Sequence, residues 1–499
     1  MMGHNIKLRP FSATSEEAAK RSAYIGWSPV RLTVIGKNPT GKPNIVRLKS
    51  KSLTSGNTQL MFKENAAAVP ADEISLDLGN ECRATCFVFG KFQEGSLHNG
   101  ASPEGKDVAV EAAWEDTPSK TDGSLAFMIR VRRDAQTLTD KARDDFTSAL
   151  SKLNACGKGI YVTDFVAMHV EGADDSQHGD AHFLPWHRLY LLDLERLLQT
   201  INPAVTLPYW RFDQPAPRLF DEGFIGATDN IPFTDDAFLP GTSNGVMARF
   251  SNTNPLSNWK IGSSNGIERV AFFDTKTEPA SRLPQFRVAS EEATLELGGD
   301  RPNRFDFGFP VGNRRADLPT TFARLPSGFS RMEGMPHGAA HVSFNGPVNN
   351  VPTAPRDPLF FLLHCNVDRL WAKWQFATDK DLPTEYSTYP YQHKREVAFA
   401  TPSHLIGLFP EDNTLRDALQ WPWDDTWSKP LNLRPPGTRS RNFTKSFTGK
   451  EITEGIPTIG DALDAFGYHS PISNVPNTFT NYLGFSYDDV PFNHSRTTA

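Results

Sequence analysis

Seven of the 13 histidines in this chain of 499 residues lie in two short stretches, 169–187 and 337–364. His337 and His341 are four residues apart, a spacing that places both imidazole rings on one face of a helix. Two rings in that arrangement can bind one metal ion, but a pair of surface histidines has the same spacing. The two stretches are therefore candidate metal sites that need further support.

His364 lies within a strongly apolar run, and a buried imidazole needs partners for its ring nitrogens. A shared metal ion would be one partner, and a backbone hydrogen bond would be another. The second stretch by itself therefore leaves a metal site and an ordinary core histidine equally open. Asp368 follows one helical turn later, and we expect it to orient a ring from behind the ligands.

The first stretch repeats this logic, with His178 and His187 flanking a short segment and His169 preceding them. His182 lies between two candidates, and we interpret it as a neighbour in contact with the site rather than a ligand. Two sets of three histidines without cysteine or carboxylate favour a metal that prefers imidazole. The H-E-x-x-H pattern of zinc hydrolases is absent. Two facing all-histidine sites suit a pair of copper ions that bind dioxygen between them.

The surrounding sequence predicts two regions that differ in secondary structure. Residues 1–24 are polar and are expected to be flexible, whereas residues 25–118 contain short alternating runs such as Val30, Leu32 and Val34, separated by Gly, Pro and Asn. That pattern predicts a small antiparallel β-sandwich. Residues 116–124 read as a linker. In residues 125–499 the pattern changes: Thr139 can cap a helix over 140–153, where Phe146, Leu150 and Leu153 recur at helical spacing. Further helices are predicted over 184–199, around 336–341 and over 358–375, with long loops over 214–330.

The composition of the chain argues against several classes of protein. The chain has 52 basic and 58 acidic side chains and a net charge of −6, which argues against nucleic-acid binding. Four cysteines are too few for a disulfide framework. No apolar stretch is long enough to cross a membrane, and no export signal is visible. We therefore expect a cytoplasmic protein, with export alongside a partner protein as the alternative.

Two long motifs carry a family resemblance. The first reads His178-x4-Phe-Leu-Pro-Trp-His187-Arg-x2-Leu-x3-Glu, and the second reads Asp357-Pro-x-Phe-Phe-x2-His364-x3-Asp368. They resemble the copper A and copper B patterns of the tyrosinase family of type 3 copper proteins, which includes catechol oxidases and molluscan hemocyanins. The stretches 201–210, 351–355 and 483–488 look like bacterial tyrosinases in particular. The resemblance covers roughly residues 129–489 and leaves out the N-terminal β region.

The resemblance implies a mainly α catalytic domain in which a four-helix bundle holds two copper ions, with O₂ as co-substrate. It places three histidines on each copper: His169, His178 and His187 on copper A, and His337, His341 and His364 on copper B. Many relatives carry a cysteine, bonded to a ligand ring, two residues before the second copper A histidine. Because Ser176 stands there, no such thioether is expected.

Further residues carry over from the resemblance. Phe360 looks like the aromatic side chain that packs on the copper pair, and Val351 aligns with the small gate residue over the site. Glu333 looks like the glutamate that holds a water and helps to deprotonate phenols. Gly338 stands where strongly hydroxylating tyrosinases often have Asn, which puts monophenol oxidation in doubt. Residues near Val342 and in the loops are expected to select the substrate.

The implied function is O₂-dependent oxidation of phenols and o-diphenols to o-quinones by a tyrosinase. The alternative within the family is a catechol oxidase or o-aminophenol oxidase with little monophenolase activity. A hemocyanin-like O₂ carrier is a remote alternative, because such chains usually string many units together and this one has a single pair of motifs. The expected partners are small phenolic substrates, and a second copy of the chain or an accessory copper-delivery protein is a further candidate.

The remaining regions carry weaker expectations. For the β region we favour a structural packing role, with a docking or oligomer module, a lid or a copper-delivery aid as alternatives. The C-terminal part of the catalytic domain includes a segment, 474–482, that could cover the pocket, with Phe479 either as a plug or as an ordinary buried aromatic.

Overall fold

The computed structural model describes residues 6–10, 24–25, 29–53, 59–65, 68–91, 107–172, 178, 183–234, 245–297, 329–378, 423, 462–463 and 485–490. These residues divide into two compact units, and the boundary falls between Arg132 and Arg133. Residues 485–490 belong to the first unit, although the sequence grouped them with the catalytic domain. Residues 423 and 462–463 belong to the second unit.

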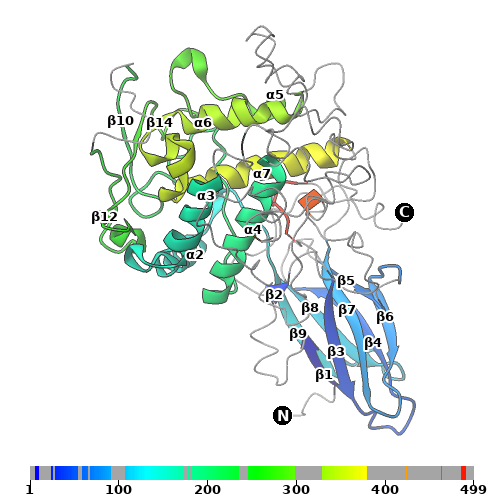
Figure 1. Cartoon of the computed structure of the whole chain (residues 1–499). Helices are drawn as coiled ribbons and strands as arrows, with labels where there is room; N and C mark the ends of the chain where they lie inside the picture. The colour runs from blue at the N-terminus through cyan, green and yellow to red at the C-terminus, as the bar shows by residue number, and fades with distance from the viewer. Residues whose placement is uncertain are drawn as a thin grey trace, which may run out of the picture. The chain divides into compact units, whose positions relative to one another are not determined.

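The first unit is built from two sheets, which Figure 1 shows in blue and cyan. One has the strand order β1-β3-β7-β5 and the other the order β2-β9-β8-β4-β6. The strands are β1 (Ile6–Pro10), β2 (Tyr24–Ile25), β3 (Val30–Gly36), β4 (Ile45–Ser52), β5 (Gln59–Lys63), β6 (Glu73–Asp77), β7 (Arg83–Lys91), β8 (Val108–Trp114) and β9 (Gly123–Ile129).

Two features of these sheets differ from the sequence-based expectation. Residues 116–124, predicted as a linker, contain the connection between the antiparallel strands β8 and β9, so the sheet extends to Ile129. The edge pair β2–β9 is parallel, whereas the other pairings among the described strands of the two sheets are antiparallel. Strand β2 has two residues, which is too short to show an alternating pattern, so the sequence did not reveal this strand.

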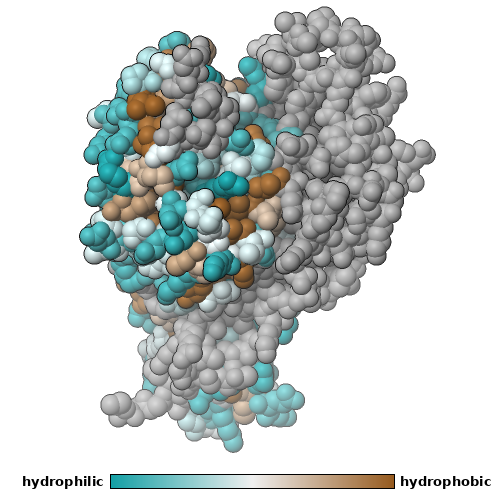
Figure 2. All heavy atoms as spheres, turned by 60° about the vertical axis from the view of Figure 1, so that its left-hand side comes forward, coloured by the Kyte–Doolittle hydropathy of each residue, from teal (hydrophilic) through white to brown (hydrophobic). Residues whose placement is uncertain are grey.

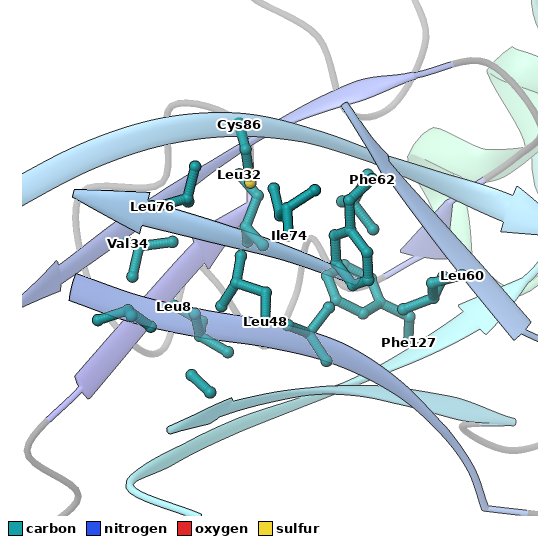
Figure 3. Packing of buried hydrophobic residues seen from close by; sticks show 14 of the residues in the cluster. Leu8, Leu32, Val34, Leu48, Leu60, Phe62, Ile74, Leu76, Cys86 and Phe127 are labelled. Atoms are coloured by element: carbon teal, nitrogen blue, oxygen red, sulfur yellow. The ribbon is translucent and has the colours of Figure 1, made fainter. Parts of the chain in front are cut away.

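A single cluster of buried side chains fills the first unit and draws on both sheets. Figure 3 shows Leu32 and Cys86 from one sheet packed with Leu48, Ile74 and Leu76 from the other. Leu32 and Leu48 are fully buried, as expected where alternate residues of a strand face a core. Burial raises the pKa of the Cys86 thiol to about 12, so this cysteine stays protonated and packs as a small apolar group.

Helices dominate the second unit. The longer ones are α2 (Asp140–Asn154), α4 (Phe183–Ile201) and α7 (Leu359–Thr378), and two short helices are α3 (Ala167–Gly172) and α6 (Ala339–His341). The Thr139 hydroxyl accepts a hydrogen bond from the Ala142 N–H and caps α2, as the sequence predicts. The helices predicted over 184–199 and 358–375 are present with slightly different bounds, and the segment predicted around 336–341 is helical as well.

Two helical segments have the wider π-helical turn: η3 (Tyr161–Val166), which leads directly into α3, and η10 (Gly334–Gly338), which leads into α6. The remaining short elements in the described part of this unit are η1 (Ala135–Thr137), η2 (Ala155–Gly157), η5 (Pro255–Asn258), η6 (Pro284–Phe286), α5 (Glu291–Leu295), η9 (Phe329–Glu333), η11 (Pro347–Asn349), η12 (Val351–Arg356), β10 (Asp229–Asn230), β11 (Lys260–Ile261), β12 (Ser264–Asn265), β13 (Val270–Ala271) and β14 (Phe344–Asn345).

The loop-rich part between α4 and α7 is tied to the start of α7 by a buried ion pair. Arg269 Nη1 donates to both carboxylate oxygens of Asp357, at 3.0 and 3.1 Å, and both side chains are fully buried. Asp357 Oδ1 also accepts from the Leu359 N–H at the first turn of α7. This network fixes the end of α7 that lies nearest His364.

The described part of the surface combines polar side chains with scattered apolar groups such as Val69 and Phe286. On the face shown in Figure 2, hydrophobic residues stand in small groups among hydrophilic ones. Among the described residues, no helix combines the length and apolarity that a membrane span requires.

Candidate metal centre

The first histidine cluster joins α3, α4 and the residue between them. His169 lies on α3, His187 lies near the start of α4, and His178 contacts both rings at centroid distances of 5.1 Å. One ring nitrogen from each of the three lies within 4.8 Å of the others. The His187 Nδ1–H donates to the Phe183 carbonyl at 2.7 Å, which turns Nε2 of that ring toward the cluster.

The second cluster joins η10, α6 and α7. The His337 Nδ1–H donates to the Glu333 carbonyl at 2.7 Å, and the His341 Nδ1–H donates to the Val348 carbonyl at 2.6 Å. The Nε2 atoms of these two rings lie 3.2 and 3.1 Å from Nε2 of His364. Three Nε2 atoms thus converge on one point.

This convergence fits a metal ion. A carbonyl oxygen only accepts hydrogen bonds, so it holds the proton on Nδ1 and leaves a lone pair on Nε2 of His337 and His341. Lone pairs that face one another repel unless a cation lies between them. Imidazole binds first-row metals at about 2.0–2.1 Å, which corresponds to nitrogen–nitrogen separations of roughly 3.3 Å in a tetrahedral or pyramidal site. The observed separations are close to that value.

A ring nitrogen of the first cluster supports the same conclusion. Nε2 of His187, which faces the first cluster, is buried and lacks a hydrogen-bond partner. Buried polar atoms without a partner are costly and rare in folded proteins. A metal ion in the first cluster would satisfy this nitrogen.

The rings are held in their neutral form. Burial is the main cause, and it lowers the pKa of His169 to about 3 and that of His341 to about 4. Burial and the neighbouring histidines hold the pKa values of His187, His337 and His364 well below the usual range. Neutral imidazole is the form that binds a metal, so the clusters are ready to bind one at neutral pH.

The two clusters face each other closely. The rings of His187 and His364 stack at a centroid distance of 4.3 Å and an angle of 13°. Phe360 stacks on His364 at 4.1 Å and meets His169 edge-on at 4.8 Å, so it touches both clusters. Phe183 contacts His187 and His337 at 4.7 and 4.8 Å. The arrangement can therefore hold two metal ions side by side in an aromatic, water-poor setting.

The structure gives Asp368 a contact that the sequence did not predict. Its Oδ1 accepts a hydrogen bond from Nε of Arg188 at 2.5 Å, while the rings of His187, His337 and His341 are oriented by backbone carbonyls instead. Sequence reasoning assigned no partner to Arg188, which the structure shows to be fully buried. The signal available in the sequence was an arginine directly after a candidate ligand in a largely apolar helix, since a buried arginine is rare unless it is paired.

The remaining predicted residues lie around the second cluster or outside the described residues. Val351 is 47% exposed and begins η12, while Val342 and Gly338 are half-buried and each follow a histidine of the second cluster. Glu333 contributes its backbone carbonyl to His337, and its side chain is half-buried. His182, Ser176 and the segment 474–482 with Phe479 lie outside the described residues.

The π-helical turns were also missed by sequence reasoning. One precedes His169 and the other contains His337, so each cluster takes a histidine from a helix with an extra residue in one turn. Extra residues of this kind in a helical turn are frequent at functional sites, but no periodic pattern in the sequence reveals them. Within the second π-helical segment, a Cβ at Gly338 would lie 3.3 Å from the Glu333 carbonyl oxygen, which is a tight contact.

The chain is similar in sequence to proteins of known family. The model of the common central domain of tyrosinase matches residues 161–377, a range that contains both clusters. Grixazone synthase from Streptomyces griseus is 31% identical over 301 residues, which are 53% of this chain and 90% of that protein. Tyrosinase from Streptomyces lincolnensis is 27% identical over 258 residues, covering 50% and 83%.

Solved structures give weaker matches. Tyrosinase from Burkholderia thailandensis has 17% identity and a TM-score of 0.37, over 74% of this chain and 77% of its own. A latent aurone synthase, a polyphenol oxidase, has 21% identity and a TM-score of 0.32, and the match spans about half of either chain (50% and 48%). The match to nearly the full length of a relative and the central-domain model together show that this chain belongs to the tyrosinase family of type 3 copper proteins and is a copper-dependent oxidoreductase.

Proposed function

We propose that this protein is a tyrosinase, which uses O₂ to oxidise monophenols and o-diphenols to o-quinones at a dicopper centre. The observation that carries the proposal is the pair of facing three-histidine clusters, with neutral rings and converging nitrogens. Neither cluster contains a thiolate or carboxylate, and imidazole suits copper.

In this proposal each cluster holds one copper. His169, His178 and His187 bind copper A, and His337, His341 and His364 bind copper B. Bound copper would supply the site at which O₂ is activated and electrons are accepted from the phenol. The chain itself holds the rings in their binding tautomer through the carbonyls of Phe183, Glu333 and Val348.

Other residues act on the phenol. The Glu333 carboxylate takes the phenolic proton, directly or through a water, and is the proposed catalytic base. Phe360 closes the space between the clusters and excludes water from it. Val351, Val342 and Gly338 border the approach to copper B, and because none of them has a large or charged side chain they leave room for an aromatic ring.

The helical segments and the N-terminal sheets each have a proposed architecture. We propose that the helical segments around the two clusters form a four-helix bundle and that the two N-terminal sheets form a β-sandwich with a packing role. The shared core of the two sheets supports the second part of this proposal. A homo-oligomer or an accessory copper-delivery partner would be the alternative use of that unit.

One observation favours a narrower activity. Gly338 has no side chain that could hydrogen-bond a water beside Glu333, and the Glu333 carbonyl leaves little room for a larger residue there. A less well held water would slow deprotonation of monophenols more than that of the more acidic diphenols. An oxidase of o-diphenols or o-aminophenols with little action on monophenols is therefore the second candidate.

Oxygen uptake by the copper-loaded full-length chain separates these candidates. Uptake with both L-tyrosine and L-DOPA is the expected result, and uptake with L-DOPA alone would favour the second candidate. Two bound coppers without uptake on either substrate, together with reversible oxygen binding, would overturn both and indicate a carrier.

A further inference from the structure

Trp423 is a buried tryptophan that the proposed oxidation chemistry does not use. It follows the end of α7 at Thr378 by many residues in sequence, yet it belongs to the helical unit and is only 4% exposed. Its indole Nε1–H donates a hydrogen bond of 2.8 Å to Oδ2 of Asp193 on α4, whose side chain is fully buried. The indole N–H and the carboxylate thus form a buried hydrogen bond between two groups that can exchange a proton.

An unbroken series of ring contacts joins this indole to the first histidine cluster. Trp423 lies 6.2 Å from Trp186, measured between ring centroids. Trp186 lies 4.9 Å from His187 and 6.0 Å from His169. Tryptophan is one of the most easily oxidised side chains, and rings in contact exchange single electrons rapidly.

The hydrogen bond to Asp193 distinguishes Trp423 from Trp259, another buried indole of the helical unit. Oxidation turns an indole into a strong acid at Nε1, and the radical persists only if that proton can leave. A carboxylate can take the proton, whereas a backbone carbonyl cannot keep it. Trp259 donates its Nε1–H to the Arg356 carbonyl at 3.1 Å, so it has no such acceptor at that bond.

We propose that Trp186, Trp423 and Asp193 form a relay that removes single oxidising equivalents from the metal centre when no phenol is bound. Trp423 loses one electron, which passes through Trp186 and reduces the oxidised metal centre by one electron. The Nε1 proton moves to Oδ2 of Asp193, leaving a neutral indole radical and a neutral carboxylic acid. A small external reductant such as ascorbate then returns the electron, and the proton returns from Asp193.

The relay rests on the proposed dicopper function and gives this chain a second role, protection of its own ligands. Without a phenol, an oxidised centre would otherwise attack the nearest histidines. The relay moves that damage to an indole that a reductant can repair.

The test treats the copper-loaded full-length protein with hydrogen peroxide in the absence of phenol. Peptide mass spectrometry then maps the oxygen added to tryptophan and histidine, and freeze-quench electron paramagnetic resonance looks for an indole radical. The variants are Trp423→Phe, Asp193→Asn and, as the matched control, Trp259→Phe. Copper content and catechol turnover before peroxide are measured for each variant, so that a loss of fold or of the proposed function is seen separately.

In the wild type we expect the radical and oxygen addition at Trp423, both suppressed by ascorbate. Trp423→Phe is expected to lose copper and activity several-fold faster under peroxide, with oxidation shifted to the ligand histidines. Asp193→Asn is expected to weaken the radical signal, and Trp259→Phe is expected to behave as the wild type. Equal inactivation rates and the same oxidation map in Trp423→Phe, with catechol turnover intact, would overturn the relay and leave the proposed function standing. Absence of copper-dependent turnover in the wild type would overturn both.

Discussion

Arg188 and Asp368 form a buried ion pair of 2.5 Å that joins α4 to α7. Arg188 directly follows His187, and Asp368 lies one turn after His364, so the pair links the two helices that each carry a histidine of a different cluster. The guanidinium also lies over the ring of Trp371, 3.7 Å from its centroid. The ion pair therefore joins, outside the metal site, the same two helices whose histidines stack on each other.

Loss of this pair should destabilise the protein strongly. Asp368→Asn leaves the Arg188 guanidinium buried without its opposite charge, and breaking a buried pair in this way costs about 3–5 kcal/mol. Denaturant unfolding of the apoprotein measures the change in the free energy of unfolding. The exposed pair Arg249–Asp229 is the control, and Asp229→Asn should cost less than about 1 kcal/mol. Equal effects of the two substitutions would contradict the structural role of Asp368.

Copper content should separate ligands from neighbours. His364→Asn removes the nitrogen that lies 3.1 Å from His341 Nε2, so the protein should lose the copper of the second cluster and retain that of the first. His182→Asn tests the interpretation of His182 as a neighbour and should keep both. Elemental analysis of the purified, copper-loaded variants gives the answer, and a loss of copper in His182→Asn would require a revised ligand set.

Glu333 offers a test of catalysis that does not disturb metal binding. Its backbone carbonyl orients His337, and Glu333→Gln keeps that carbonyl while removing the carboxylate base. We expect unchanged copper content with a fall in kcat on monophenols of about 10²-fold or more, the size of effect typical of a general base. Oxygen uptake at saturating substrate provides the measurement, and unaltered kcat would exclude Glu333 as the base.

The apoprotein should lose stability in mildly acidic solution. Histidine in an unfolded chain has a pKa near about 6.5. In the folded state, burial lowers the pKa of His169 to about 3 and that of His341 to about 4. Below pH 6.5 the unfolded chain therefore binds more protons than the folded chain. The free energy of unfolding decreases as the pH is lowered through this range.

Stability is lost between the pKa of histidine in the unfolded chain and the lowered pKa values of His169 and His341 in the folded chain. Denaturant unfolding of the metal-free protein at about pH 7 and about pH 5 should show a clear decrease, with His341→Asn less sensitive to pH than the wild type. Stability that stays constant across this range would mean that the rings are not buried in the folded apoprotein.

Parts of the fold follow from local sequence patterns. Helical spacing at Phe146, Leu150 and Leu153 and the Thr139 cap predicted α2, and these three side chains are buried on one face. The alternation of Leu32 and Val34 predicted β3. The linker over 116–124 was mistaken because a hairpin connection and a linker have the same composition, and only the pairing of β8 with β9 distinguishes them.

The sequence by itself determined the two groups of histidines, the metal chemistry that they suit and, through two long motifs, the family. Only the tertiary structure decided how the groups meet: the carbonyls that set the tautomers of His187, His337 and His341, and the buried pair Arg188–Asp368. It also brought Trp423 to Asp193. Local periodicity reports which face of an element is buried, whereas these contacts join residues far apart in the chain. Their geometry depends on the packing of whole helices.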